Sequence, residues 1–245
     1  MSHFSQLDNI LRNQTFNDDS VIEGAILPYM NVFADMENGV AVLSDLRKGL
    51  SRIVAGEFGV RLGIKQTDSV DSIWEREILM MMDEEERESK YLTELRFFNF
   101  VHRLPKSRRK NYYLATKLRM KCGDGKFVDV LHRMFYMYDS IGSVNFALCL
   151  YSPIVFDFHG KSVVVDSVSG QTEELTSAGD SRILSSRERQ VLKLIEKGKT
   201  SNDIADLLAI SKHTVSRHRQ EIIAKLQVRN SVEACRVAKS LHILD

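Results

Sequence analysis

Cysteine is scarce in this 245-residue chain, and the three that occur, Cys122, Cys149 and Cys235, lie far apart. None forms a C-x-x-C pair, and no histidine stands near them at the spacing of metal ligands. Scattered cysteines are typical of reduced thiols in a cytosolic protein rather than of a disulfide framework or a zinc site. We therefore expect no bound metal.

Long apolar runs are also missing. The longest uncharged stretch, Ser140 to Phe156, contains Gly142, Asn145 and Pro153 and is shorter than the roughly 20 apolar residues that a membrane span needs. Polar residues interrupt any apolar run at the N-terminus, so a secretory signal is not expected. These features predict a cytoplasmic protein without a membrane partner.

Catalytic motifs are the third absence. The sequence has no Gly-rich phosphate loop, no H-E-x-x-H, no G-x-S-x-G and no paired-carboxylate motif with supporting context. We therefore expect a protein that is not an enzyme, with no catalytic residues.

Charge is divided unevenly along the chain, although its formal net value is only +1. Residues 184–245 hold 12 Lys and Arg against 7 Asp and Glu, whereas residues 1–183 hold 22 against 26. A basic end behind an acidic body indicates a polyanionic partner for the end alone.

Four short helices are predicted within residues 183–245. Ser185 and Glu188 have the spacing of a capping box, in which a hydroxyl and a carboxylate satisfy the first free N–H groups. The helix starts are marked by Ser185, by Thr200 or Ser201, by Ser211, and by Asn230 with Glu233 three residues later. Apolar residues at helical spacing give each helix a buried side, so an all-α four-helix domain is expected.

The second and third of these helices are joined by Ala209-Ile210-Ser211, about the turn length of a helix-turn-helix. If Val215, Ile222 and Leu226 face the core, one outward face of the third helix carries His213, Ser216, Arg217 and Gln220. Arg and Gln can bond base edges in pairs, and Ser can reach several bases. These four residues are predicted to read DNA bases.

Residues suited to phosphate surround that face. The start of the second helix is rich in small polar side chains, and its free N–H groups suit a phosphate. The expected contacts with the DNA backbone are Thr200, Ser201, Asn202, Lys212, Thr214, Arg219 and Lys225.

Further residues fit a family pattern: Leu184–Leu192, Ile204-Ala205, Ile210-Ser211, Thr214-Val215, His218-Arg219, Lys225–Val228 and Glu233-Ala234. Together they resemble the LuxR/GerE-type helix-turn-helix domain over residues 183–244. The resemblance implies a dimer on DNA, with the third helix in the major groove and the fourth helix often pairing two copies. It makes Ser216, Arg217 and Gln220 base readers, and Thr200, Asn202, Thr214 and Lys225 backbone contacts. The sequence departs at Ser216, where the family often has Lys.

Residues 1–170 are expected to form a separate domain, joined by a linker over 171–182. Periodicity predicts a loosely packed helix within 1–20, a helix over 22–34, short helices joined by turns over 46–63, and a helical block over 70–101. A basic patch, 106–110, is expected in a loop. The predicted strands are Val40–Leu43, Leu114–Lys121, Phe127–Tyr138 and Val144–Tyr151.

The layout Asn38–Leu43, Phe58–Gly63 and Leu118–Lys126 resembles a PAS sensor domain over residues 25–157. The resemblance implies an antiparallel sheet with helices around a small cavity that holds flavin, haem, a metabolite or nothing. The flavin-linking Asn-Cys-Arg signature is absent, and His102 and His132 are more typical of ordinary packing than of haem ligands. The sequence indicates no cofactor and does not identify cofactor-binding residues. A small-molecule ligand in this domain stays one of the alternatives.

These observations predict an α+β protein that regulates transcription by binding specific DNA, with a signal or partner sensed by the N-terminal domain. In the alternative, that domain serves only dimerisation or protein interaction, without a ligand. The expected partners are double-stranded DNA and a second copy, joined through the fourth helix, the N-terminal domain or both. RNA polymerase is a further candidate partner. A ligand-sized polar cavity would favour sensing, and a filled core would favour interaction.

Overall fold

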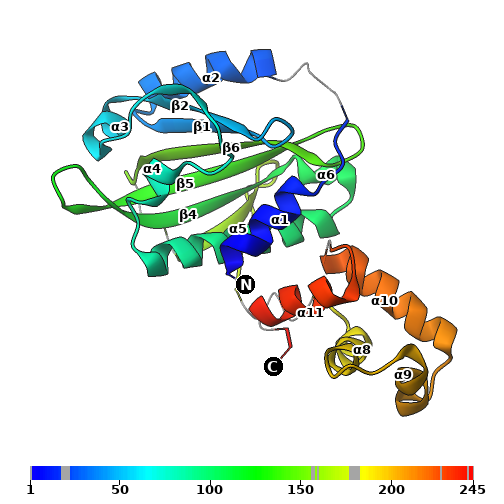
Figure 1. Ribbon diagram of the computed structural model, residues 1–245. Helices are drawn as coiled ribbons and strands as arrows, with labels where there is room; N and C mark the ends of the chain where they lie inside the picture. Colours follow the sequence, from blue (N-terminus) through cyan, green and yellow to red (C-terminus); the bar gives the residue numbers. More distant parts are fainter. Residues whose placement is uncertain are drawn as a thin grey trace.

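Eight strands form one antiparallel sheet in the order β3-β2-β1-β6-β5-β4-β7-β8 (Figure 1). The computed structural model describes residues 2–17, 23–155, 158, 160–176, 183–226, 228–241 and 243–244. The strands are β1 (Val40–Asp45), β2 (Leu50–Ala55), β3 (Thr67–Val70), β4 (Tyr112–Lys121), β5 (Phe127–Tyr138), β6 (Val144–Pro153), β7 (Ser162–Asp166) and β8 (Thr172–Glu174). The fold is α+β, and the antiparallel sheet predicted for the N-terminal part is confirmed.

Helices cover both faces of the sheet. On one face, α2 (Glu23–Met36) packs Met30 and Phe33 against Leu43 and Phe146. On the other face lie α1 (His3–Arg12) and the long α5 (Glu84–Arg103), and α1 crosses in front of α5 in Figure 1. Every residue of β1 is buried, because this central strand has a helix layer on each side.

The first helix is better packed than the sequence indicated. Leu7 is fully buried, and Ile10 and Leu11 are nearly so, within the same core cluster as Leu95 and Phe98 of α5. Trp74 Nε1 also donates to the Asp8 carboxylate at 2.6 Å. The expected loose packing over residues 1–20 is therefore wrong for α1, whose short apolar stripe finds a complete surface on α5.

Residues 46–63 contain a strand, which corrects the prediction of short helices alone. β2 pairs with β1 in a hairpin that turns at Gly49, which has φ 71°, and α3 (Glu57–Leu62) follows. Gly56 between them lies so close to α2 that an added Cβ would meet the Ala34 carbonyl oxygen at 2.2 Å. Gly49 thus marks a hairpin turn, and Gly56 marks a close contact between its backbone and α2. Neither glycine interrupts a helix.

The predicted helical block over 70–101 is split. It begins with the last residue of β3, continues through the single turn α4 (Arg76–Leu79) and ends within α5. Asp83 begins α5, because its side chain accepts a hydrogen bond from Glu86 N at 2.8 Å. The basic patch expected in a loop forms the short helix α6 (Lys106–Arg109).

Strand β8 lies inside the segment predicted as the linker, 171–182. Its three residues pair with Val163, Val164 and Val165 of β7, so the sheet extends to Glu174. Residues 177–182 lie outside the described residues. We call α1 to β8 the sheet domain and α8 to α11 the helical domain.

The helical domain contains α8 (Ser186–Glu196), α9 (Ser201–Leu208), α10 (Lys212–Leu226) and α11 (Ser231–Ser240). Its core consists of Leu184, Val191, Leu192, Ile204, Val215, Ile222, Leu226, Ala234, Val237, Ala238 and Leu241. No helix in the described part of the chain is both long and apolar enough to cross a membrane.

Candidate nucleic-acid interface

The helices of the helical domain begin where their capping residues predict. Ser185 Oγ accepts from Glu188 N at 3.2 Å, and the Glu188 carboxylate accepts from Ser185 N at 2.6 Å, which completes the expected capping box of α8. Asn230 caps α11 by accepting from two backbone N–H groups. Glu233 bonds Arg229 N instead of Asn230 N, so the second expected box is only half formed.

The turn between α9 and α10 is tight. Ala209 adopts the left-handed conformation with φ 51°, and Ile210 N bonds the Ala205 carbonyl at 3.0 Å. Ser211 Oγ then accepts from Thr214 N at 3.0 Å, which begins α10 as predicted. The left-handed residue reverses the chain in three residues, so that α9 and α10 pack as a helix-turn-helix.

The four predicted base readers lie on one exposed stripe of α10. Val215, Ile222 and Leu226 are buried on the opposite side, while His213, Ser216, Arg217 and Gln220 are exposed. Arg217 has a side chain 73% exposed and donates to Glu221 Oε1 at 2.9 Å. The stripe thus presents guanidinium, amide, imidazole and hydroxyl groups to solvent.

At the start of α9, the predicted phosphate site contains an acidic group. Asp203 accepts from both Thr200 N, at 2.9 Å, and Thr200 Oγ1, at 2.8 Å, and these bonds hold the pKa of Asp203 below its usual value. Thr200 is therefore engaged in a capping box. Asn202 is exposed beside it, and Ser201 is half-buried.

Arg219 connects two helix starts. Its guanidinium donates to Ser201 Oγ at 3.0 Å on α9 and to Ser231 Oγ at 3.2 Å on α11. Lys212 is exposed and Thr214 half-buried in the first turn of α10. Lys212 and Thr214 thus lie next to the end of α9, whereas Arg219 lies beside Ser201 at the start of α9.

Lys225 lies in a different setting, at the other end of α10. Its ammonium is 2.6 and 2.7 Å from the two carboxylate oxygens of Glu188, whose side chain is 2% exposed. Burial raises the pKa of Glu188, but the bonds from Lys225 and Ser185 outweigh burial and lower it overall. Sequence reasoning missed this pair because its members are 37 residues apart.

His218 joins a group of potential metal ligands that the sequence did not indicate. One ligand atom each from Glu188, His218 and Glu221 lies within 4.8 Å of the others. Lys225 already contacts both oxygens of Glu188, and His218 Nδ1 is 3.5 Å from Glu221. The Lys225 ammonium neutralises Glu188, and the Arg217 guanidinium pairs with Glu221, so we assign no metal ion to this group.

Polar side chains also gather in the core of the sheet domain. Glu75, Lys90 and Glu94 are buried around a cavity of about 30 Å³, with Lys90 Nζ 2.5 Å from Glu94 and Ser44 Oγ 3.0 Å from Glu75. Burial raises the pKa of Glu75 despite the nearby Lys90 charge. Such a cavity has room for about one or two water molecules, so it is too small for a cofactor or a metabolite.

The two histidines considered as haem ligands are packed against aromatic rings. His132 is fully buried and stacks on Tyr151 with ring centroids 4.7 Å apart. His102 stacks on Phe98, and its Nδ1 lies 2.8 Å from the Phe98 carbonyl oxygen. Burial lowers the pKa of His102 to about 4, so its ring is neutral at pH 7.

Comparison with known proteins gives a match in the helical domain. The family described as "Bacterial regulatory proteins, luxR family" matches residues 182–238. The uncharacterized response regulatory protein YgeK of Escherichia coli is 39% identical over 74 residues, which cover 30% of this chain and 50% of that protein. The oxygen regulatory protein NreC of Staphylococcus epidermidis is 38% identical over 76 residues, 31% of this chain and 35% of NreC. The chain thus spans half or less of the length of these curated relatives.

A solved structure, the phage VqmA–DPO complex, aligns over 89% of this chain and 90% of its own, with 15% sequence identity and a TM-score of 0.32. The tight α9–α10 turn, the capped helices and the match over residues 182–238 lead to one conclusion: the chain carries a LuxR-family helix-turn-helix domain at its C-terminal end.

Proposed function

We propose that this protein is a sequence-specific DNA-binding regulator of transcription. The observation that carries the proposal is the exposed stripe His213, Ser216, Arg217 and Gln220 on α10, opposite the buried side of the same helix. An α-helix fits the major groove, where guanidinium and amide groups discriminate base pairs by paired hydrogen bonds. Arg217 and Gln220 are the principal base readers in this account.

In this proposal the backbone contacts come from the start of α9 and from the first turn of α10. Lys212 supplies an exposed cation, and the bond from Arg219 holds Ser201 in place beside the exposed Asn202. Thr200 acts through the cap that it forms with Asp203. Lys225 stabilises the domain through Glu188 and contributes less to DNA than the sequence suggested.

A dimer on DNA would use α11. Its inward side is filled by Ala234, Val237 and Ala238, whereas Val232 on the outward side is 61% exposed. An exposed apolar side chain at this position suits contact with the same helix of a second copy. RNA polymerase stays a predicted partner.

For the sheet domain, the small size of its core cavity favours a role in dimerisation or protein interaction over a ligand bound inside the core. The 30 Å³ cavity is far below the roughly 300 Å³ at which small-molecule sites begin. We therefore propose that the sheet domain influences the helical domain through its surface, and not through a ligand held in its core.

The function is tested by recovering genomic DNA bound to the purified protein and sequencing it. The proposal predicts a recurring sequence motif among the recovered fragments, which is weakened when Arg217→Ala protein is used. Recovery of DNA without any common motif would contradict sequence-specific binding.

A further inference from the structure

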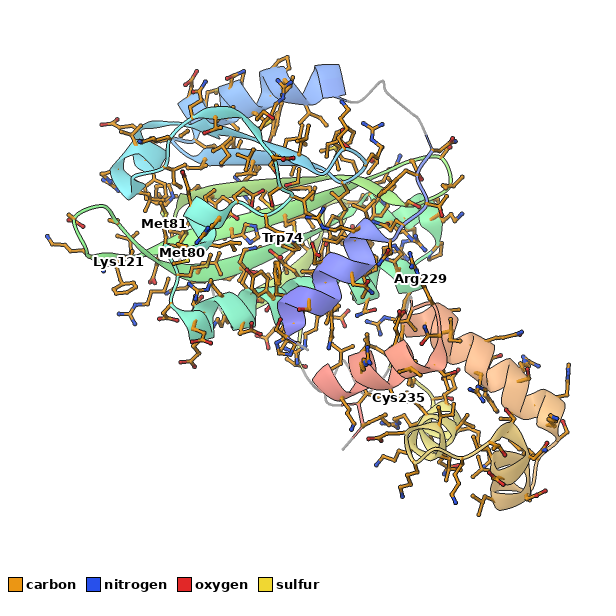
Figure 2. All side chains as sticks on the ribbon, in the orientation of Figure 1. Trp74, Met80, Met81, Lys121, Arg229 and Cys235 are labelled. Carbon is orange, nitrogen blue, oxygen red and sulfur yellow. The ribbon has the colours of Figure 1, made fainter. Side chains whose placement is uncertain are left out.

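A cleft of about 920 Å³ separates the sheet domain from the helical domain. One wall is α1, and one end is formed by α6 with the β5–β6 turn. The opposite wall consists of Val228 and Arg229, after α10, and of Glu233, Arg236 and Val237 on α11. Figure 2 shows Arg229 between α1 and the start of α11. Ligand sites in proteins commonly have volumes of roughly 300–1,000 Å³, so this cleft has the size of one.

The lining of the cleft is cationic. Two carboxylates reach it, from Asp8 and Glu233. The basic side chains are Arg12, Lys106, Arg109, Arg229 and Arg236. Asp8 is already bound to Arg12 Nε at 2.7 Å and to Trp74 Nε1 at 2.6 Å, so its charge is used locally.

Two cations on the sheet-domain side, Arg109 and Lys106, are held in place without being neutralised. Arg109 donates to the carbonyls of Leu104, His102 and Gly142 at 3.1–3.2 Å, and burial lowers its pKa. Lys106 Nζ donates to the Ile141 carbonyl at 2.6 Å. Carbonyl oxygens orient a cation but carry no formal charge, so both groups keep a net positive charge facing the cleft.

Arginines face them from the helical domain. Arg229 donates from Nη2 to the Asn13 carbonyl at 3.4 Å, which links the two domains directly. Arg236 is exposed on α11. Among the residues that the structure describes, neither of them, nor Lys106 or Arg109, has a carboxylate within ion-pair distance.

We propose that this cleft binds an organic anion of about nucleotide size that carries two or more phosphate or carboxylate groups. Guanidinium groups bind such oxyanions in pairs of hydrogen bonds, and cations on both walls require more than one anionic group to be neutralised together. Because the ligand contacts both domains, it fixes the position of α11 relative to α1. The regulatory consequence, a changed affinity for DNA, rests on the proposed function; the binding itself does not.

The test is calorimetric titration of the full chain, without DNA, with three probes: ADP, inorganic pyrophosphate and citrate. Binding of at least one probe is expected, and Arg236→Gln should weaken it by about tenfold, the effect of losing roughly one charged hydrogen bond. Arg236 is exposed, so this variant is expected to fold, and its circular dichroism melting curve checks that. Arg76→Gln, an exposed arginine on α4 outside the cleft, is the matched control and should bind as the wild type does.

The pattern of probes identifies the chemistry, since preference for ADP and pyrophosphate indicates phosphate and preference for citrate indicates carboxylate. The inference is overturned if no probe binds, or if Arg236→Gln and Arg76→Gln bind the probes equally well. It is also overturned if Arg236→Gln lowers the affinity for duplex DNA and leaves the affinity for every probe unchanged. Binding of a probe by a protein that retains no DNA would leave this inference intact and refute the proposed function instead.

Discussion

The ammonium of Lys225 is 2.6 and 2.7 Å from the two carboxylate oxygens of Glu188, and the carboxylate is almost completely buried. Glu188 also completes the cap at the start of α8 through Ser185 N. One carboxylate thus ties the end of the candidate recognition helix to the beginning of the first helix of the domain. Lys225 is a structural residue in this account before it is a contact for DNA.

We predict that Lys225→Met destabilises the protein by about 1–2 kcal/mol, because it leaves the buried Glu188 carboxylate without its ammonium. The value is reduced from that of a fully buried pair because Lys225 is 41% exposed. Urea unfolding measures it. Lys193→Met, at an exposed position on α8, should change the unfolding free energy little. Equal stability of Lys225→Met and the wild type would show that the pair is not structural.

For Arg217→Ala we expect loss of sequence discrimination. A good paired contact to a base is worth about 1–3 kcal/mol against the wrong base, so specific affinity should fall by about 5- to 150-fold. Affinity for unrelated DNA should change far less. Fluorescence anisotropy with a selected site and a scrambled duplex measures both. Equal weakening on the two duplexes would assign Arg217 to the phosphate backbone.

Lys212→Ala should behave in the opposite way, weakening all DNA about equally. Each phosphate contact contributes about −0.9 to the slope of log affinity against log salt, so the slope should become shallower by about that amount per subunit. Titrations at several salt concentrations give the slope. Lys65→Ala, at an exposed site in the sheet domain, is the control. An unchanged slope for Lys212→Ala would remove Lys212 from the interface.

Val232→Asp tests the dimer. A charge on the outward side of α11 should disfavour burial of that surface against a second copy. Light scattering should then report a mass near the 28.0 kDa of one chain, instead of twice that. Val168→Asp, at a site 76% exposed in the sheet domain, should leave the dimer intact. A dimeric Val232→Asp protein would place the interface elsewhere.

The imidazole of His102 should titrate near pH 4, because burial against Phe98 disfavours its charged form. In the unfolded chain it titrates near 6.5. The unfolded state therefore binds this proton at a higher pH than the folded state does. The contribution of His102 to stability is fully present above about pH 6.5 and is lost as the pH falls toward 4. NMR titration, with the signal assigned by its loss in His102→Gln, measures the folded pKa. A value near 6.5 would contradict the burial argument.

Local signals account for the parts of the fold that the sequence predicted well. Each helix of the helical domain begins at a capping residue that bonds backbone N–H groups only two or three residues further on, so the start of the helix can be predicted from neighbouring residues. These caps are Ser185, Thr200, Ser211 and Asn230. The exposed stripe on α10 follows from the same helical spacing. The hairpin strands β4, β5 and β6 likewise pair with neighbours along the chain.

Long-range partners account for what the sequence missed. β2 forms because β1 and β3 lie on either side of it, and its flanking glycines resembled helix breaks. The Lys225–Glu188 pair and the contact between Arg229 and Asn13 join residues 37 and 216 positions apart. Neither they nor the cationic cleft appear in any local pattern, because tertiary packing creates them.

The central claim is most directly tested by gel retardation of promoter fragments from the protein's own genome at low salt. We predict retardation of particular fragments at concentrations that leave others free, with binding that falls steeply as salt rises because phosphates are being neutralised. Absence of retardation of any fragment would contradict the account.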